Sequence, residues 1–335
     1  MIISDKQELR RCVKRIVRRA DVVEASLDFD VSGGEMGVEA LLDALRVPAF
    51  PPEEAMRRML ADGTLLGAEA AAVFAALDAM ELPVHDLNRA QELQRSYERD
   101  AYLREVLDAM HARQVLVRVP ASKAADVQFA DDRLSALIVA EEDGFAPSRY
   151  GVDYQGAARM LADAAAAAGA RHVMLPVYDE QALRYCMMPL CEDTGCALHI
   201  CLRDAVEIDA FAQLMDEFTD VRALVWSVPE AERRLIETAA TRPRMLVRLV
   251  DTSHIGMALS RLGTRFVPYA SGAALPEMML GGWIAAREEI IAALCGAYLP
   301  LARAGFQLQS AAIESDVERL LCGNMLSLAS GAGQG

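Results

Sequence analysis

Two aspartates that lie one residue apart, Asp28 and Asp30, are the strongest candidates for chemistry in this sequence. They stand at the end of a short apolar segment, residues 22–28, that predicts a strand. Paired carboxylates suit a hard divalent cation such as Mg²⁺ or Mn²⁺, because these ions prefer oxygen ligands. A structural role is equally open, since aspartates also cap turns. The pair predicts either a metal site or a turn cap.

The histidines and cysteines give weaker signals. A zinc site needs imidazoles that converge at several strand ends, and only His199 and His254 are placed to do so. His172 begins a predicted strand, at the end away from the expected site. A series of cysteines recurs every five residues, and this spacing over helix, loop and strand predicts buried free thiols: Cys186, Cys191, Cys196 and Cys201.

The elements that must position these residues alternate between strand and helix. Apolar runs predict eight strands, at residues 22–28, 115–119, 134–139, 172–177, 197–202, 222–226, 245–250 and 265–270. Helices are expected between the later strands, at residues 155–168, 207–218, 229–240 and 255–262. Strands that are apolar on both faces and separated by helices are typical of a parallel sheet. We therefore predict an α/β fold, a (β/α)₈ TIM-type barrel.

The domain organisation follows from the same pattern. We expect one barrel domain over residues 1–335, with a helical subdomain inserted at residues 34–113 after the first strand. Helical segments at residues 276–298 and 315–328 form the C-terminus, and the Ser/Gly/Ala run at residues 330–335 predicts a flexible tail. A glycine-rich nucleotide loop is absent from the sequence, which disfavours nucleotide-binding sheets.

The composition of the chain limits which binding partners and which cellular location we expect. A formal charge of −15 argues against nucleic acid, since phosphate binding needs a basic face. The sequence shows neither a secretory leader nor an apolar run long enough for a membrane span, so we expect a cytoplasmic protein without membrane contact. Seven cysteines, an odd number, fit reduced thiols. We expect a small-molecule ligand and self-association into a homo-oligomer.

In barrels of this kind the active site lies at the carboxyl ends of the strands. The polar residues there carry both charge signs and suit a small polar or anionic ligand. We assign three expected roles to them. Acid–base or anion-binding catalysis falls to Arg248, Asp251 and His254; substrate binding falls to Lys123, Tyr178, Arg203 and Ser271; metal binding falls to Asp28, Asp30 and His199.

Residues 262–273, the following helix through Trp283, and residues 320–324 resemble uronate isomerases. They are most similar to the glucuronate-isomerase-like branch of the amidohydrolase superfamily. The resemblance implies a barrel that opens sugar acids and interconverts aldose and ketose. It also implies one divalent metal, held by a His-x-His pair after the first strand, with an aspartate after the last. Matched by position, these three residues fall on Asp28, Asp30 and Gly272, none of which keeps the family's identity.

Three functions remain open. The first is a divergent metal-dependent isomerase or hydrolase that acts on or binds a small sugar acid or related anionic metabolite, with Mn²⁺, Mg²⁺ or Zn²⁺ as cofactor. The second is a non-catalytic barrel with a binding or assembly role and no metal. The third is a phosphatase, because the spacing of Asp28 and Asp30 is similar to the motif of haloacid-dehalogenase-type phosphatases. The eight-strand count opposes the third, since those enzymes are built on an open sheet.

Overall fold

A computed structural model describes residues 2–3, 6–27, 68–83, 86, 89–90, 92–93, 98–140, 154–273 and 275–330. Its centre is one parallel sheet of eight strands in which each strand lies beside its neighbours in the chain. The strands are β2 (Val22–Leu27), β3 (Ala112–Pro120), β4 (Leu134–Val139), β5 (His172–Leu175), β6 (Ala197–Leu202), β7 (Ala223–Ser227), β8 (Met245–Arg248) and β9 (Phe266–Val267). The eight predicted strands are confirmed.

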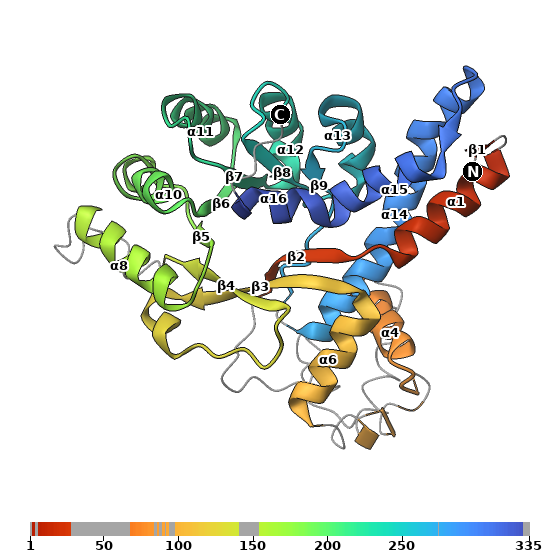
Figure 1. The fold of residues 1–335 in the computed structure, drawn as a ribbon, viewed down its shortest axis with the longest axis horizontal. Coiled ribbons are helices and arrows are strands. Elements are labelled where there is room, and N and C mark those ends of the chain that lie inside the picture. Colours follow the sequence, from red (N-terminus) through yellow and green to blue (C-terminus); the bar gives the residue numbers. More distant parts are fainter. Residues whose placement is uncertain are drawn as a thin grey trace.

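The sheet curls into a half-barrel, with helices on its outer face (Figure 1). The prediction of a closed barrel differs from the structure at one seam: among the described residues, no strand pairing joins β9 to β2. Strand β9 has only 2 residues, Phe266 and Val267, and both pair with β8. The sequential strand order also differs from a doubly wound sheet, in which the order reverses, so the phosphatase alternative lacks its scaffold.

Alternation along each strand sends side chains to two cores. In β3, Val115, Val117 and Val119 belong to the core between sheet and helices, whereas Leu116 belongs to the core inside the half-barrel. Because successive side chains in a strand point to opposite faces, Arg118 shares the inward face with Leu116. In the other strands, too, every second side chain points into the half-barrel.

Helices cover the outer face of the sheet (Figure 1). They are α8 (Tyr154–Ala167), α9 (Glu180–Ala182) with a π-helical turn (Leu183–Met187), α10 (Met188–Thr194), α11 (Ala205–Glu217), α12 (Pro229–Ala239) and α13 (Ile255–Leu262). The helices expected between the later strands are thus present within a few residues of their predicted ends. Three predicted thiols, Cys186, Cys191 and Cys196, are free and buried, and the fourth, Cys201, is free and half-buried.

A long helix, α14 (Pro276–Arg303), organises the rest of the chain. It contacts α1 (Lys6–Arg19), α4 (Ala68–Ala79) and α6 (Arg99–Met110). Its buried Arg287 donates to the carbonyl oxygens of Val17, Ala20 and Met110, which have no partner within their own helix at the C-terminal ends of α1 and α6. Most of the predicted insertion at residues 34–113 lies outside the described residues, so its extent stays a prediction.

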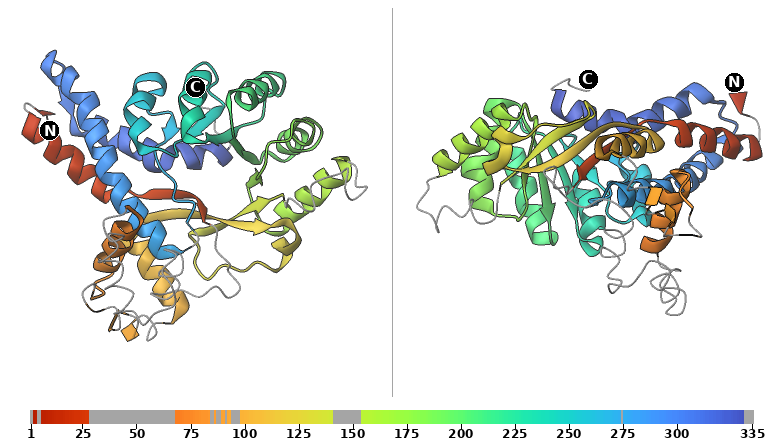
Figure 2. Two further views of the ribbon diagram at one scale, coloured as in Figure 1. Left: turned by 180° about the vertical axis from the view of Figure 1, so that it is seen from behind. Right: turned by 90° about the horizontal axis from the view of Figure 1, so that it is seen from below.

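The C-terminal segments cross one end of the half-barrel (Figure 2). They are α15 (Ser310–Glu318), a π-helical turn (Arg319–Gly323) and α16 (Asn324–Ser330), and a short strand β10 (Leu308–Gln309) that pairs with β1 (Ile2–Ile3). The Asn324 amide donates to the carbonyls of Thr264 (2.6 Å) and Phe266 (2.8 Å) at β9. Met325 and Leu328 enter the inner core beside Val23. Helix α16 thereby closes the end where the strands begin, which we call the base.

Within the described residues, none of the helices combines the length and apolar character that a membrane span requires. The tail predicted at residues 330–335 lies outside the described part, apart from Ser330, the last residue of α16.

Candidate functional site

The mouth of the half-barrel, where the strands end, holds two arginines. By the parity of their strands, Arg118 in β3 and Arg248 in β8 both point inward, as do Cys201 in β6 and Trp226 in β7. The charge of Arg118 lies close enough to Arg248 to contribute to the lowering of that residue's pKa. Among the described residues, the inward side chains of the mouth therefore include two cations, in a chain whose formal charge is −15.

Arg248 is held tightly. It is 7% exposed, and its Cζ lies 4.8 Å from the centre of the Trp226 ring, a cation–π arrangement. Its Nη2 donates to the carbonyl of Ala270 at 3.5 Å. Burial lowers the pKa of Arg248, while the carboxylate of Glu24 opposes that shift. A guanidinium nevertheless stays charged at neutral pH, so the mouth keeps a fixed positive charge.

Glu24 bridges the open seam between β2 and β9. Its side chain is fully buried, and its Oε2 accepts hydrogen bonds from the backbone N–H of Ser271 (3.0 Å) and the indole N–H of Trp283 (2.8 Å). Tyr269 packs edge-on against Trp283 with ring centres 5.2 Å apart. A side chain at Gly282 would place its Cβ 2.0 Å from the Tyr269 hydroxyl, so this close approach requires glycine. One carboxylate thus links β2 to the segment after β9, at the edge where the described residues show no strand pairing.

Gly272, where the resemblance implies an aspartate, lies beside Arg248. A Cβ at this position would be 3.7 Å from Arg248 Nη2, and the backbone has φ +57°, a left-handed conformation that favours glycine. A cationic side chain therefore lies beside the position for which the resemblance implies an aspartate.

Two histidines form a buried pair deeper in the half-barrel. His172 Nδ1 lies 2.9 Å from His199 Nε2, and the rings meet edge to face at 84°. Burial lowers the pKa of His172 to about 4 and lowers that of His199 well below its usual value. Both rings are therefore neutral at pH 7. The predicted metal ligand His199 has already committed one ring nitrogen to His172.

Three strand-end aspartates are helix caps. The Asp251 carboxylate accepts from the N–H of Ser253 at 2.8 Å, which caps the short turn Thr252–His254 and helps to lower the pKa of Asp251. Asp179 and Asp204 cap α9 and α11 in the same way. An aspartate after a strand thus satisfies the first N–H groups of the next helix. The catalytic role assigned to Asp251 stays a prediction.

The other predicted site residues are spread around the rim. The His254 ring meets the buried carboxylate of Glu232 at 2.5 Å, and the exposed Arg203 pairs with Glu207 at the start of α11. The Tyr178 hydroxyl is buried without a hydrogen-bond partner among the described residues, and burial raises its pKa to about 12. Lys123 is exposed on the 3₁₀ helix η2 (Ala121–Asp126). The structure brings only Arg248 and Ser271 to the cluster around Glu24.

The described residues do not fit a divalent cation. Among them, no group of three His, Cys, Asp or Glu side chains is placed to hold a metal ion. His199 feels the positive charges of both Arg118 and Arg248, which help to lower its pKa and which also repel a cation. The other two predicted ligands, Asp28 and Asp30, lie outside the described residues, so their metal role stays a prediction.

Sequence reasoning missed Arg118, Glu24 and the pairing of Trp226 with Arg248. A signal was present, because the triplet Leu-Val-Arg occurs twice, at residues 116–118 and 246–248. In both places arginine takes the inward position that follows an inward leucine. A charged residue on the apolar face of a buried strand marks a site, since burying a charge is costly without partners.

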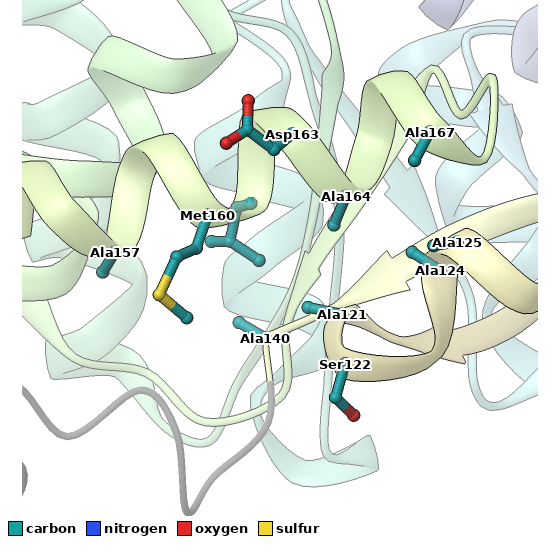
Figure 3. A pocket seen from close by; sticks show the side chains of 11 residues that line it. Ala121, Ser122, Ala124, Ala125, Ala140, Ala157, Met160, Asp163, Ala164 and Ala167 are labelled. Carbon is teal, nitrogen blue, oxygen red and sulfur yellow. The ribbon is translucent and has the colours of Figure 1, made fainter.

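A cavity of about 430 Å³ lies elsewhere, between η2 and α8 (Figure 3). Alanines of both helices face it, together with Met160, while the Asp163 carboxylate points away. This lining offers an anion no charged partner. The mouth is therefore the better candidate for the site.

Comparisons with known proteins agree on the fold. No family model matches the chain, and no curated protein matches it in sequence. A uronate isomerase from Bacillus halodurans C-125 superposes with a TM-score of 0.84, covering 98% of this chain and 97% of that one at 15% identity. A uronate isomerase from Thermotoga maritima gives a TM-score of 0.64 at 10% identity, covering 95% and 97%. The chain therefore has the fold of the uronate isomerases.

Proposed function

We propose that this protein binds a small sugar acid or a related anionic metabolite in the mouth of the half-barrel, through Arg248 and Arg118. The observation that carries the proposal is the buried Arg248, stacked on Trp226 beside a second inward arginine. A guanidinium matches a carboxylate with two parallel hydrogen bonds. Because Trp226 already fixes one of the two cations, less conformational entropy is lost on binding.

The described residues support binding better than catalysis. Aldose–ketose isomerisation needs a group that moves a proton between two carbons at neutral pH. Burial raises the pKa values of Cys201 and Tyr269, and it lowers that of His199. None of these three is poised to exchange a proton near pH 7. Asp28 and Asp30 lie outside the described residues, so isomerisation of the bound sugar acid is the second candidate, favoured by the fold.

The binding proposal is tested by calorimetric titration with D-glucuronate, and with D-glucose as the uncharged match. We expect saturable binding of D-glucuronate alone, and a loss of roughly 10- to 100-fold in affinity for Arg248→Met, as for a hydrogen bond to a charged group. Arg248→Lys keeps the charge and loses the second hydrogen bond, so its affinity for D-glucuronate should lie between those of the unchanged protein and Arg248→Met. Arg159→Met, on the exposed side of α8, is the matched control. Equal binding of the two sugars would refute the proposal.

The second candidate has its own test. The purified protein is analysed for bound metal, and D-glucuronate is followed by NMR for appearance of the ketose with and without added Mn²⁺, Mg²⁺ or Zn²⁺. Turnover that is lost in Asp28→Ala, together with one equivalent of metal, would establish the isomerase. Binding without turnover under all four conditions would leave a non-catalytic binding protein.

A further inference from the structure

A second polar cavity, of about 320 Å³, lies at the base, at the opposite end from the mouth. It is formed by the beginnings of β3, β4 and β5 and by helix α16. Its lining residues are Gln114, Ser135, Ala136, Gly169, Arg171, His172, Met325 and Leu326. None of them is acidic. Its polar lining residues include Gln114, Ser135, Arg171 and His172, and its apolar ones include Ala136, Met325 and Leu326.

The polar lining residues offer hydrogen-bond donors to the cavity. The Gln114 amide donates to the Ser135 hydroxyl oxygen at 2.7 Å, so the hydroxyl hydrogen of Ser135 is left to donate elsewhere. His172 uses Nδ1 for His199, which leaves Nε2 for the cavity that the ring lines. Ser135 therefore offers one neutral donor beside the guanidinium of Arg171, and His172 offers a second in the tautomer that carries its hydrogen on Nε2.

Arg171 differs from its counterparts around the base. An arginine immediately precedes, or is the second residue of, six of the strands: Arg113, Arg133, Arg171, Arg222, Arg244 and Arg265. Arg244 and Arg265 donate to carbonyls at the ends of α11 and α12, where the last turn of a helix leaves acceptors without partners.

The remaining base arginines, except one, are engaged as well. Arg133 pairs with Asp131 and Asp108, Arg222 donates to the carbonyl of Ser327, and Arg113 lies 3.7 Å from the Cys322 sulfur. The guanidinium of Arg171 makes no hydrogen bond or ion pair with any described residue. Its guanidinium is exposed at the rim of a cavity that has no acidic lining residue. A negatively charged ligand in this cavity would supply the ion-pair partner.

We propose that the base cavity is a second ligand site, for a short-chain carboxylate, separate from the sugar-acid site at the mouth. The carboxylate pairs with Arg171 and accepts hydrogen bonds from Ser135 and His172, while its hydrocarbon chain lies on Met325 and Leu326. The charged rim selects an anion, and the apolar wall of α16 selects one that carries an alkyl chain.

The hydrogen bond between His172 and His199 couples ligand binding at the base to the tautomer of His199 inside the half-barrel. A carboxylate at the base accepts a hydrogen bond from the N–H at His172 Nε2, so the neutral ring has its proton there and Nδ1 is an acceptor. His199 must then donate from Nε2, which leaves its Nδ1 unprotonated inside the half-barrel. Ligand binding at the base thus fixes the tautomers of both rings.

Binding is tested by titrating the full-length protein with sodium butyrate and sodium acetate at constant ionic strength, with n-butanol as the neutral match. Imidazole ¹⁵N–¹H spectra report the tautomers of His172 and His199. We expect saturable shifts with both acids, roughly tenfold tighter binding of butyrate from its two extra methylene groups, and none with n-butanol. Arg171→Gln should weaken butyrate binding at least tenfold.

The control is Arg159→Gln, an exposed arginine on α8 away from the cavity, which should bind butyrate as the unchanged protein does. Ser135→Ala, which removes one neutral donor, should weaken binding a few-fold with the fold intact. Histidine resonances that stay fixed in butyrate would overturn the proposal. Equal losses in Arg171→Gln and Arg159→Gln would overturn it too, since they would show only a general effect of charge.

Discussion

The two ends of the half-barrel bury polar groups by opposite means. At the mouth Arg248 stays charged, and its partners are the Trp226 ring, the Ala270 carbonyl and the nearby carboxylate of Glu24. Toward the base His172 and His199 are neutral and satisfy each other. Burial costs a charge far more than it costs a neutral dipole. A charge that is kept despite this cost is better evidence for a ligand site than a neutral pair is.

The edge between β2 and β9 is where the buried charge of Arg248 lies close to a buried carboxylate. The guanidinium of Arg248 lies near Glu24, and Glu24 in turn links β2 to the segment after β9. Charge compensation near Arg248 and one of the links across the seam therefore depend on the same buried carboxylate. The base has no such dependence, because Asn324 and the apolar residues of α16 close it.

The largest expected effect comes from breaking the seam. Glu24→Ala removes the acceptor of two buried N–H groups and a charge close to Arg248, so it should lower the free energy of unfolding by about 3–5 kcal/mol. Urea unfolding followed by tryptophan fluorescence measures the change, since Trp283 reports the lost contact directly.

Glu24→Gln is the matched control for this variant. It keeps one oxygen acceptor and the side-chain volume but removes the charge, so its loss should be smaller than that of Glu24→Ala. A Glu24→Ala protein as stable as the unchanged one would show that the seam is held by other contacts.

The second effect concerns the base and depends on pH. The pKa of His172 is about 4 in the folded protein, against about 6.5 in an unfolded chain. Between these values the unfolded state binds a proton that the folded state does not, so stability falls as the pH falls from about 6.5 to about 4. Between pH 7 and pH 5, His172 alone should remove about 2 kcal/mol, measured by urea unfolding.

The control for the pH effect is His172→Asn, which keeps a side-chain amide near the position of Nδ1 but does not titrate. Its stability should change less between pH 7 and pH 5 than that of the unchanged protein. His199 is shifted in the same direction, so part of the slope should remain. Identical slopes for the two proteins would contradict a neutral, buried His172.

The strands and helices could be read from the sequence because their pattern is local. The run at residues 134–139 is a strand with the predicted ends, and 255–262 is a helix with the predicted ends. The open seam could not be read in this way. It depends on a side chain in β2 that meets Ser271 and Trp283, more than 240 positions later in the chain.

The site is harder to predict from the sequence than the fold, for a physical reason. An aspartate after a strand predicts either a ligand contact or a helix cap. Asp251 caps a helical turn, and its catalytic role stays a prediction. The informative residues were inside the strands, where Arg118 and Arg248 interrupt apolar runs. Parity along a strand, rather than position at its end, identifies such side chains.

A smaller effect is expected from Gly272→Asp, which returns a carboxylate to the position beside Arg248. The new group would neutralise a cation of the mouth and compete with the ligand's own carboxylate. Aspartate tolerates the left-handed backbone better than most residues, so the fold should persist. We expect affinity for D-glucuronate to fall about tenfold, as in the loss of one ion-pair partner. Gly272→Asn supplies the same shape without the charge and should bind nearly as the unchanged protein does.

The smallest effect comes from the aromatic support of Arg248. A double-mutant cycle of Trp226→Phe and Arg248→Met, read by urea unfolding, should give a coupling energy of about 1 kcal/mol, the size of a partly desolvated cation–π contact. Trp226→Phe alone should weaken D-glucuronate binding only a few-fold, because phenylalanine supports the guanidinium less strongly but still fills the space. Zero coupling would mean that the 4.8 Å approach is mere packing. The charge kept at the mouth would then depend on Glu24 and the Ala270 carbonyl, and the contrast with the neutral base would rest on electrostatics alone.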